Sequence, residues 1–237
     1  MKRSKSYKQV RDSLEALRLY APSEALDVIK KTSRAKFDET VEVHFNLGID
    51  PRHADQQLRG TLVLPHGSGR DLRVAVIAPD SYHEAARVAG ADHVGDDDLI
   101  AQIQSGWLEF DILIATPDSM RKLGKLGKLL GSKGLMPNPK SGTVTTQVDT
   151  VVRDFKSGKI AYRNDKYGLI HVIIGKCSFE QDKLVENFMT LYQTIIKAKP
   201  AKAKGSYIQS LYACATMGPS VAIEPLETKW RLKITIK

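Results

Sequence analysis

The stretch LRVAVIAPDSYHEAARVAGADHVGDDDLIAQIQSGWLEFDILIATP, residues 72–117, decides the fold of the middle of this chain. It begins and ends with continuous apolar runs, at 72–79 and 110–117, which are typical of strands covered on both faces in a parallel sheet. Helical patterns lie between the runs, and three aspartates at 96–98 supply acidic side chains for a helix N-terminus. This order, continued by helices after Pro117, predicts a small three-layer α/β domain.

The sequences on either side of this segment have a different pattern. In TVEVHFNLGI, residues 40–49, apolar side chains alternate with polar ones, and similar alternation recurs at 59–65, 168–175 and 206–216. Strands with one apolar face suit an antiparallel sheet that helices cover on one side. An amphipathic helix is predicted to follow, starting with a capping box at 178–181.

These two patterns predict a discontinuous domain built from both ends of the chain, with an α/β domain inserted into it. Gly-rich stretches at 65–69 and 156–159 mark the crossings, so residues 1–66 and 158–237 are assigned to the terminal domain and 67–157 to the inserted one. The fold class is therefore α/β overall, with an α+β terminal domain containing an antiparallel sheet and an inserted three-layer domain of Rossmann-like organisation.

Charge is divided in the same way. The whole chain has 36 Lys and Arg against 27 Asp and Glu, a formal net charge of +9. The terminal segments carry 25 of the basic and 15 of the acidic residues, whereas the inserted domain carries 11 and 12. Within the insert, residues 119–140 hold six Lys or Arg and no acid. Because phosphate contacts require clustered cations, this distribution favours a nucleic-acid partner over a merely solvated basic surface.

Other classes of protein find little support in the sequence. The apolar runs fall short of the roughly 20 residues of a membrane span, and the basic N-terminus lacks the apolar core of a secretory signal. The two cysteines, Cys177 and Cys214, form no C-x-x-C pair. Neither a disulfide framework nor a zinc ribbon is therefore indicated, and a reducing compartment is expected.

A search for catalytic chemistry gives no candidate. The only G-x-G, at 67–69, precedes the first buried strand instead of following it, and the Gly/Lys-rich segment 124–134 does not match a phosphate-binding loop. The six histidines are scattered singly, and His44 and His171 lie in strand patterns, where a hydrogen-bonded structural role is favoured. The aspartates at 96–98 are interpreted as complementing a helix dipole rather than as a cation site. We expect no enzyme, no cofactor and no metal.

Two loops remain as candidate nucleic-acid contacts. The Lys-rich segment 119–140 ends in KGLMPNPKSG, where Met136 is expected to be exposed and Lys133 and Lys140 flank it. A solvated helix and turn would look the same, so both interpretations stay open. The second loop is TMGPS, residues 216–220, whose glycine would allow a ligand to approach the backbone closely. From the residues alone, a plain turn between strands is the simpler interpretation.

Several longer motifs, in their order along the chain, resemble one family. They include KFDETVEVHFNLGID (36–50), FDILIATPDSM (110–120), GLMPNPK (134–140), YRNDKYGLIHVIIGK (162–176) and TMGPS. They are similar to the L-one family of large-subunit ribosomal proteins, in its bacterial or organellar form, and the resemblance extends over about 30–225. It implies the same two-domain architecture as the patterns above.

The resemblance also implies a function. Members of this family bind a helical junction of large-subunit ribosomal RNA and form a mobile stalk, which helps to release deacylated tRNA from the exit site. Many also repress translation of their own operon by binding an mRNA element that mimics the ribosomal site. For this chain the resemblance implies a protein that is a monomer when free, has no membrane partner, and belongs to cytoplasmic or organellar ribosomes. Two alternatives to a ribosomal stalk protein are kept. The first is a standalone translational repressor with the same fold, and the second is a nucleotide-dependent α/β enzyme.

The family's RNA contacts, carried over residue by residue, fall mainly on the terminal domain. Thr216 and Met217 are expected to matter most, and Glu42 and Asp165 are expected to orient neighbouring donors or to accept from 2′-hydroxyls rather than to meet phosphates. The implied contacts are Lys36, Phe37, Thr40, Glu42, Asp165, Lys166, His171, Ser210, Thr216, Met217 and Gly218, with Lys133, Met136 and Lys140 as secondary contacts.

We expect the polar face of strand 40–46 to lie beside the TMGPS turn, so that hydroxyls, backbone N–H groups and lysines meet RNA backbone and 2′-hydroxyls. The sequence departs from the family pattern in two places. Gly131-Ser-Lys-Gly134 stands where the family usually has G-P-R-G, so an Arg-specific role there is not supported. Residues 226–237 run past the usual end, as either an extra edge strand or a basic tail.

Overall fold

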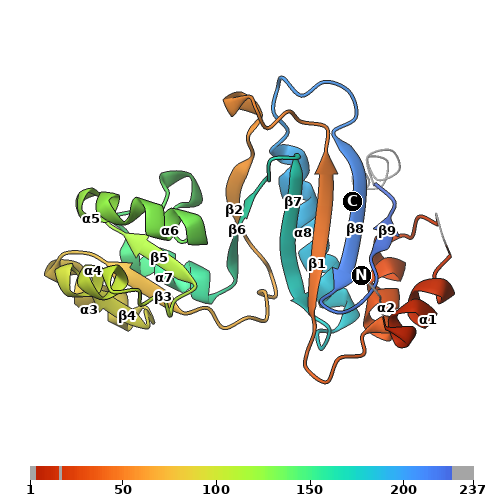
Figure 1. The fold of residues 1–237 in the computed structure, drawn as a ribbon, viewed down its shortest axis with the longest axis horizontal. Helices are drawn as coiled ribbons and strands as arrows, with labels where there is room; N and C mark the ends of the chain where they lie inside the picture. The colour runs from red at the N-terminus through yellow and green to blue at the C-terminus, as the bar shows by residue number, and fades with distance from the viewer. Residues whose placement is uncertain (1–3, 16–17, 226–237) are drawn as a thin grey trace, which may run out of the picture. The chain divides into compact units, whose positions relative to one another are not determined.

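The structure is a computed structural model that describes residues 4–15 and 18–225 (Figure 1). The described chain divides into two compact units. Unit 1 contains the described residues up to Leu58, Leu64–Gly69, and those from Tyr162 onward; unit 2 contains Arg59–Val63 and Arg70–Ala161. The terminal domain predicted from the Gly-rich stretches included Arg59–Val63, and the structure places this strand in unit 2 instead.

That strand, β2 (Arg59–Val63), pairs with β6 (Lys159–Arg163) in a separate two-stranded sheet. The alternation at 59–65 predicted a strand of the antiparallel sheet, and this assignment was wrong. Within β2 only Leu62 is buried. Alternation reports that a strand has one apolar face but does not identify the strand that pairs with it, which explains the error.

Unit 1 contains a four-stranded antiparallel sheet in the order β7-β1-β8-β9. The strands are β7 (Leu169–Lys176), β1 (Thr40–Leu47), β8 (Ile208–Ala215) and β9 (Val221–Ile223). Burial alternates along the whole of β1, with Val41, Val43, Phe45 and Leu47 inside, as the sequence predicted. This alternation leaves the polar side chains of β1 on the other face of the sheet.

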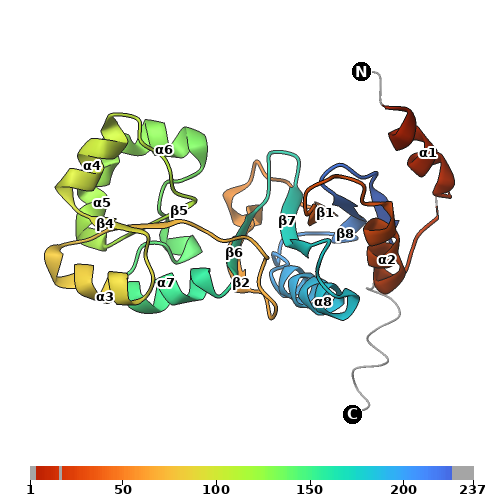
Figure 2. The same cartoon turned by 90° about the horizontal axis from the view of Figure 1, so that it is seen from below.

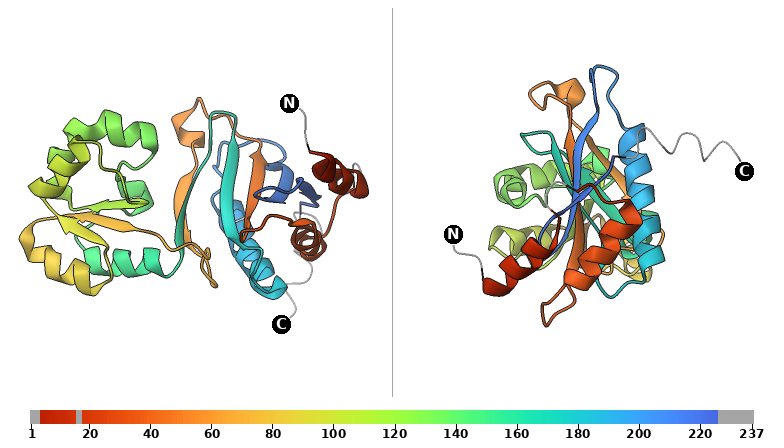
Figure 3. Two further views of the ribbon diagram at one scale, coloured as in Figure 1. Left: turned by 60° about the horizontal axis from the view of Figure 1, so that its bottom comes forward. Right: turned by 90° about the vertical axis from the view of Figure 1, so that its right-hand side faces the viewer.

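Two helices, α2 (Pro22–Thr32) and α8 (Gln181–Lys197), cover the apolar face, and Figure 3 shows both on the same side of the sheet. The buried stripe of α8 includes Phe188 and Tyr192, and the Tyr192 ring lies 6.3 Å from that of Phe45. The predicted capping box at 178–181 is absent. The helix begins at Gln181, so Glu180 is the N-cap residue, and it makes no side-chain capping hydrogen bond. The Ser178 hydroxyl donates to Asp38 instead.

Unit 2 contains a parallel sheet in the order β4-β3-β5, formed by β4 (His93–Gly95), β3 (Val74–Ile77) and β5 (Ile112–Ala115). Every residue of β3 is buried. Separate apolar clusters lie on its two faces. As Figure 2 shows, helices cover both faces, which confirms the predicted three-layer α/β organisation. The helices are α4 (Asp97–Gln104), α5 (Pro117–Leu123) and α6 (Gly127–Lys133) on one face, and α3 (His83–Val88) and α7 (Val148–Lys156) on the other.

The remaining described elements are short or terminal. Helix α1 (Lys5–Ser13) precedes the sheet, and the 3-10 turns are η1 (Ala54–Gln56), η2 (Asp80–Tyr82), η3 (Gly124–Leu126) and η4 (Pro139–Ser141). None of the helices in the described residues has both the length and the apolar composition to cross a membrane. The predicted edge strand or tail at 226–237 lies outside the described residues.

Candidate nucleic-acid interface

The sheet of unit 1 has one face that the helices α2 and α8 do not cover. The outward side chains of β1 lie on it, and the strand registers place outward residues of β7 and β8 beside them: His171 and Tyr212 flank His44, and Ser210 flanks Asn46. Figure 1 looks onto the sheet with α8 behind it. We call this surface the open sheet face; it comprises Thr40, Glu42, His44, Asn46, His171, Ser210, Tyr212 and Cys214.

The turn between β8 and β9, residues 216–220, lies at one end of the open sheet face. The Thr216 hydroxyl accepts a hydrogen bond from the Thr40 N–H at 3.0 Å and donates to the Thr40 carbonyl at 3.3 Å. The Gly218 N–H donates to the Ala215 carbonyl and tightens the turn. The Met217 side chain is 61% exposed. The strand and the turn are therefore joined, as the sequence predicted.

A buried carboxylate lies beneath this junction. Glu39 is only 1% exposed. Its Oε1 accepts from the Ser33 hydroxyl and from the backbone N–H groups of Arg34 and Ala35, at 2.8–3.0 Å. Its Oε2 accepts from the Met217 N–H at 2.9 Å. Burial raises the pKa of Glu39, but these hydrogen bonds outweigh burial and leave the pKa below its ordinary value.

Sequence reasoning did not identify Glu39. An acidic residue just before a strand looks like part of a solvated surface, and one of the hydrogen bonds that Glu39 accepts comes from Met217, 178 positions away. The neighbouring segment does present side chains to solvent: Lys36 is exposed and Phe37 is 56% exposed. The Lys176 ammonium reaches the Thr40 hydroxyl at 2.9 Å and adds a cation at the same end of the sheet.

The opposite end of the open sheet face carries the turn between β6 and β7. Asp165 Oδ1 accepts from the backbone N–H groups of Tyr167 and Leu169, each at 2.8 Å, so this carboxylate shapes the turn. Lys166 is exposed, with its ammonium 5.0 Å from the centre of the Tyr167 ring. Asp165 Oδ2 lies 3.8 Å from His171 Nε2. These contacts agree with an orienting role for Asp165.

Three polar side chains form a chain across the middle of the open sheet face. His44 Nδ1 lies 2.8 Å from His171 Nδ1, and His44 Nε2 lies 3.3 Å from Cys214 Sγ. Burial and the neighbouring His171 lower the pKa of His44, and Glu42 opposes them only in part. Burial, assisted by Glu42, raises the pKa of Cys214. The neutral imidazole and the thiol are therefore the favoured forms near neutral pH.

The secondary candidates lie in unit 2. Lys133 ends α6, Lys140 lies in η4, and both are exposed. Met136 is only half-exposed and packs against the apolar cluster under α4, α5 and α6, so the prediction that it is exposed was wrong. The glycine and prolines around Met136 end the helix, but its side chain still packs against the apolar cluster and is partly buried.

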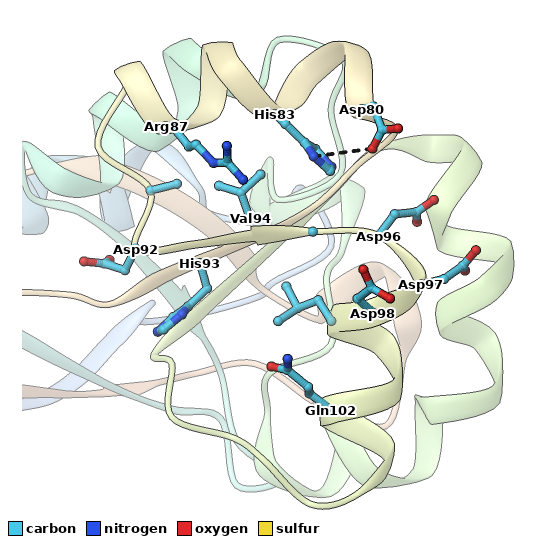
Figure 4. Close-up of a pocket in the computed structure, with 13 residues that line it drawn as sticks. Asp80, His83, Arg87, Asp92, His93, Val94, Asp96, Asp97, Asp98 and Gln102 are labelled. Atoms are coloured by element: carbon cyan, nitrogen blue, oxygen red, sulfur yellow. Dashed lines mark ion pairs between the residues drawn. The ribbon is translucent and has the colours of Figure 1, made fainter.

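Unit 2 also contains a hollow of about 580 Å³ beside β4, lined by aspartates (Figure 4). Lys122 pairs with Asp96 and Asp97 at 2.7 and 2.8 Å, and Lys156 pairs with Asp92 at 2.8 Å. Among residues 4–15 and 18–225, no three His, Cys, Asp or Glu are grouped so that they could hold a metal ion. Since α4 begins at Asp97, the aspartates lie at a helix N-terminus, as predicted.

Comparisons with known proteins agree with the resemblance seen in the sequence. The model of the Ribosomal protein L1p/L10e family matches residues 29–219. The large ribosomal subunit protein uL1 of Thermobifida fusca (strain YX) is 52% identical over 229 residues, which cover 97% of this chain and 97% of that protein. Every predicted contact residue lies within the matched range.

Proposed function

Because this chain belongs to the ribosomal protein L1p/L10e family, we propose that it binds large-subunit ribosomal RNA through the open sheet face and the turn 216–220. The family makes the chain a structural constituent of the large ribosomal subunit. The observation that carries the proposal is the junction of Thr40, Thr216 and Met217, where fixed polar groups adjoin exposed apolar ones.

The chemistry of this junction suits RNA backbone and sugar. Lys36 and Lys176 supply positive charge for phosphates. The hydroxyls of Thr40 and Thr216 can exchange hydrogen bonds with 2′-hydroxyls. Phe37 and Met217 offer apolar contacts for the faces of sugars or unstacked bases. At the other end of the open sheet face, Asp165 shapes the turn between β6 and β7 by accepting from the Tyr167 and Leu169 N–H groups, and Glu42 and Asp165 can also accept hydrogen bonds from 2′-hydroxyls.

A second proposed contact lies in unit 2. Lys133 and Lys140 are exposed, and neither makes an ion pair within the part of the chain that the structure describes. Exposed cations without acidic partners contribute salt-dependent contacts to phosphates. Met136, which is half-buried against the apolar cluster of unit 2, would offer only the exposed part of its side chain to such a contact.

The experiment that tests the RNA interface is a titration of the full-length protein with a fragment of large-subunit ribosomal RNA that carries the stalk junction. Met217→Ala should weaken binding by about 1–3 kcal/mol, the range for a packed contact at an interface. Val88→Ala, which truncates a 76% exposed apolar side chain of α3, is the matched control and should bind as the wild type does. Equal affinities for all three proteins would refute the interface.

The finer functions are extensions of this proposal. RNA binding at the junction would form the mobile stalk that helps to release deacylated tRNA from the exit site, and the same surface would bind operon mRNA if the protein represses its own synthesis. Because repression needs the same contacts, Met217→Ala should weaken both complexes in parallel. Loss of one complex with retention of the other would show that the two RNAs use different surfaces.

A further inference from the structure

We propose that Glu39 is the positioning residue of the RNA-contacting turn, and that its buried carboxylate fixes the Met217 backbone against the segment that carries Lys36 and Phe37. The inference rests on the proposed RNA interface and deepens it, because it assigns a role to a residue that does not itself touch RNA. Glu39 lies under the contact surface and is 1% exposed.

The two oxygens of Glu39 bind two different pieces of chain. Oε1 gathers the N–H groups of Arg34 and Ala35 with the Ser33 hydroxyl, so it fixes the segment that leads into Lys36. Oε2 accepts from the Met217 N–H, at 2.9 Å, and from no other donor in the described residues. One side chain thus sets the distance between the two groups of predicted contacts that lie at this end of the sheet.

The surroundings make this link rigid. A carboxylate that leaves water is costly unless donors replace the lost hydration, and Glu39 has four donors from within the protein. Hydrogen bonds to an ionised acceptor are stronger than neutral ones. The turn therefore holds an exposed Met217 side chain on a fixed backbone, which reduces the ordering that RNA binding would otherwise require.

Sheet formation does not need this side chain. At the same position the backbone carbonyl of Glu39 accepts from the Cys177 N–H at 2.8 Å, and Thr40 pairs with Lys176 in the β1–β7 register. Backbone groups therefore join β1 to β7 at this end without the Glu39 carboxylate. The carboxylate adds the connection to the turn, and its loss should affect RNA binding more than the fold.

Glu39→Gln separates the two halves of this arrangement. A glutamine retains one oxygen, which can still serve the three donors at 33–35, but it turns an NH₂ group toward the Met217 N–H. Two donors then face each other and the turn is released. We expect the full-length variant to bind the stalk-junction RNA about tenfold more weakly than the wild type, as for loss of a hydrogen bond to a charged group.

The effect should act through Met217. In a Met217→Ala background, Glu39→Gln should weaken binding by no more than about threefold, because a positioning residue loses its role when the positioned side chain is gone. Asp111→Asn is the matched control: Asp111 in unit 2 is also a carboxylate that accepts a backbone N–H, from Arg73, and its pKa is likewise lowered. This control should bind RNA as the wild type does.

The outcomes separate the two proposals. If Met217→Ala weakens binding and Glu39→Gln does not, the positioning role is refuted while the interface stands. If neither change weakens binding, the interface itself is refuted. Equal effects of Glu39→Gln in both backgrounds would show that Glu39 acts on the fold and not through Met217.

A measurement on the wild-type protein covers the case in which Glu39→Gln does not fold. Hydrogen exchange of the Met217 amide, followed by NMR, should be slow before RNA is added and should change little on binding. An amide that exchanges freely in the free protein, and becomes protected only with RNA, would overturn the inference.

Discussion

The side-chain hydroxyl of Thr216 is hydrogen-bonded to both backbone polar groups of Thr40, accepting from its N–H and donating to its carbonyl. These residues are 176 positions apart in the chain. β1 and β8 pair only from Val41 and Ala215 onward, so the hydroxyl extends the pairing by one step beyond the last backbone bridge. A single oxygen thereby joins the first strand of the sheet to the proposed RNA-binding turn.

Replacing Thr216 with alanine should affect both the fold and RNA binding. The loss of two partly exposed hydrogen bonds should lower the free energy of unfolding by about 1 kcal/mol, and the affinity for stalk-junction RNA should fall by about 1–3 kcal/mol. Chemical denaturation and RNA titration measure the two effects. Thr216→Ser retains the hydroxyl and is the control; a serine variant as weak as the alanine variant would show that the methyl group, not the hydroxyl, is responsible.

Most of the fold follows from local patterns in the sequence. Strict alternation in β1 identified the buried face, because Val41, Val43 and Phe45 all point to one face of the strand and are buried only if that face is covered. Continuous apolar runs identified β3 and β5 as strands covered on both sides. Both predictions depend on the pattern of apolar residues within one strand, and this pattern can be read directly from a short stretch of sequence.

The features that were missed depend on distant parts of the chain. The partner of β2 is fixed by the return of the chain at β6, and the Ser178 hydroxyl is used by Asp38, 140 positions away. Glu39 accepts a hydrogen bond from the Met217 N–H, 178 positions away. The motif TMGPS marked the turn, but no local pattern shows that an acidic residue would lie under it.

Acid should weaken the fold through Glu39. Its pKa is below the ordinary value of 4.5, because four hydrogen bonds outweigh burial. The unfolded chain therefore takes up this proton at higher pH than the folded chain, so the stabilisation is complete above pH 4.5 and is lost as pH falls through the folded pKa. Unfolding free energies of the wild type and Glu39→Gln should converge as pH falls below 4.5. A constant difference would contradict the assignment.

His44 should report RNA binding at the middle of the open sheet face. Burial and His171 lower its pKa below the ordinary value of 6.5, so in the free protein the NMR titration midpoint should lie below 6.5. A phosphate brought near this face favours the charged imidazole, and the midpoint should rise on addition of stalk-junction RNA. An unrelated RNA duplex at the same salt concentration is the control. A midpoint that the specific RNA leaves unchanged would place the contact elsewhere.

Protonation of His44 should also lower the free energy of unfolding. Because the folded state favours neutral His44, the unfolded state binds the proton first as pH falls below 6.5, and the free energy of unfolding decreases until the folded pKa is reached. The variant His44→Gln lacks this dependence. Denaturation at pH 7.5 and 5.5 should therefore show a smaller loss of stability in the variant, and an equal loss would assign the effect to other groups.

Lys133 and Lys140 should contribute to RNA affinity mainly through counterion release. Each replacement by glutamine removes one exposed cation from unit 2, so the slope of log affinity against log salt should become shallower by about one unit or less per lysine. Lys183→Gln is the matched control, because Lys183 belongs to α8, on the covered side of the sheet, and pairs with Glu180 at 2.9 Å. Affinities measured at several salt concentrations give the slopes. If the variant with both Lys133 and Lys140 replaced has the same slope as the control and the wild type, unit 2 does not belong to the RNA interface. Loss of a phosphate contact must change the number of ions released.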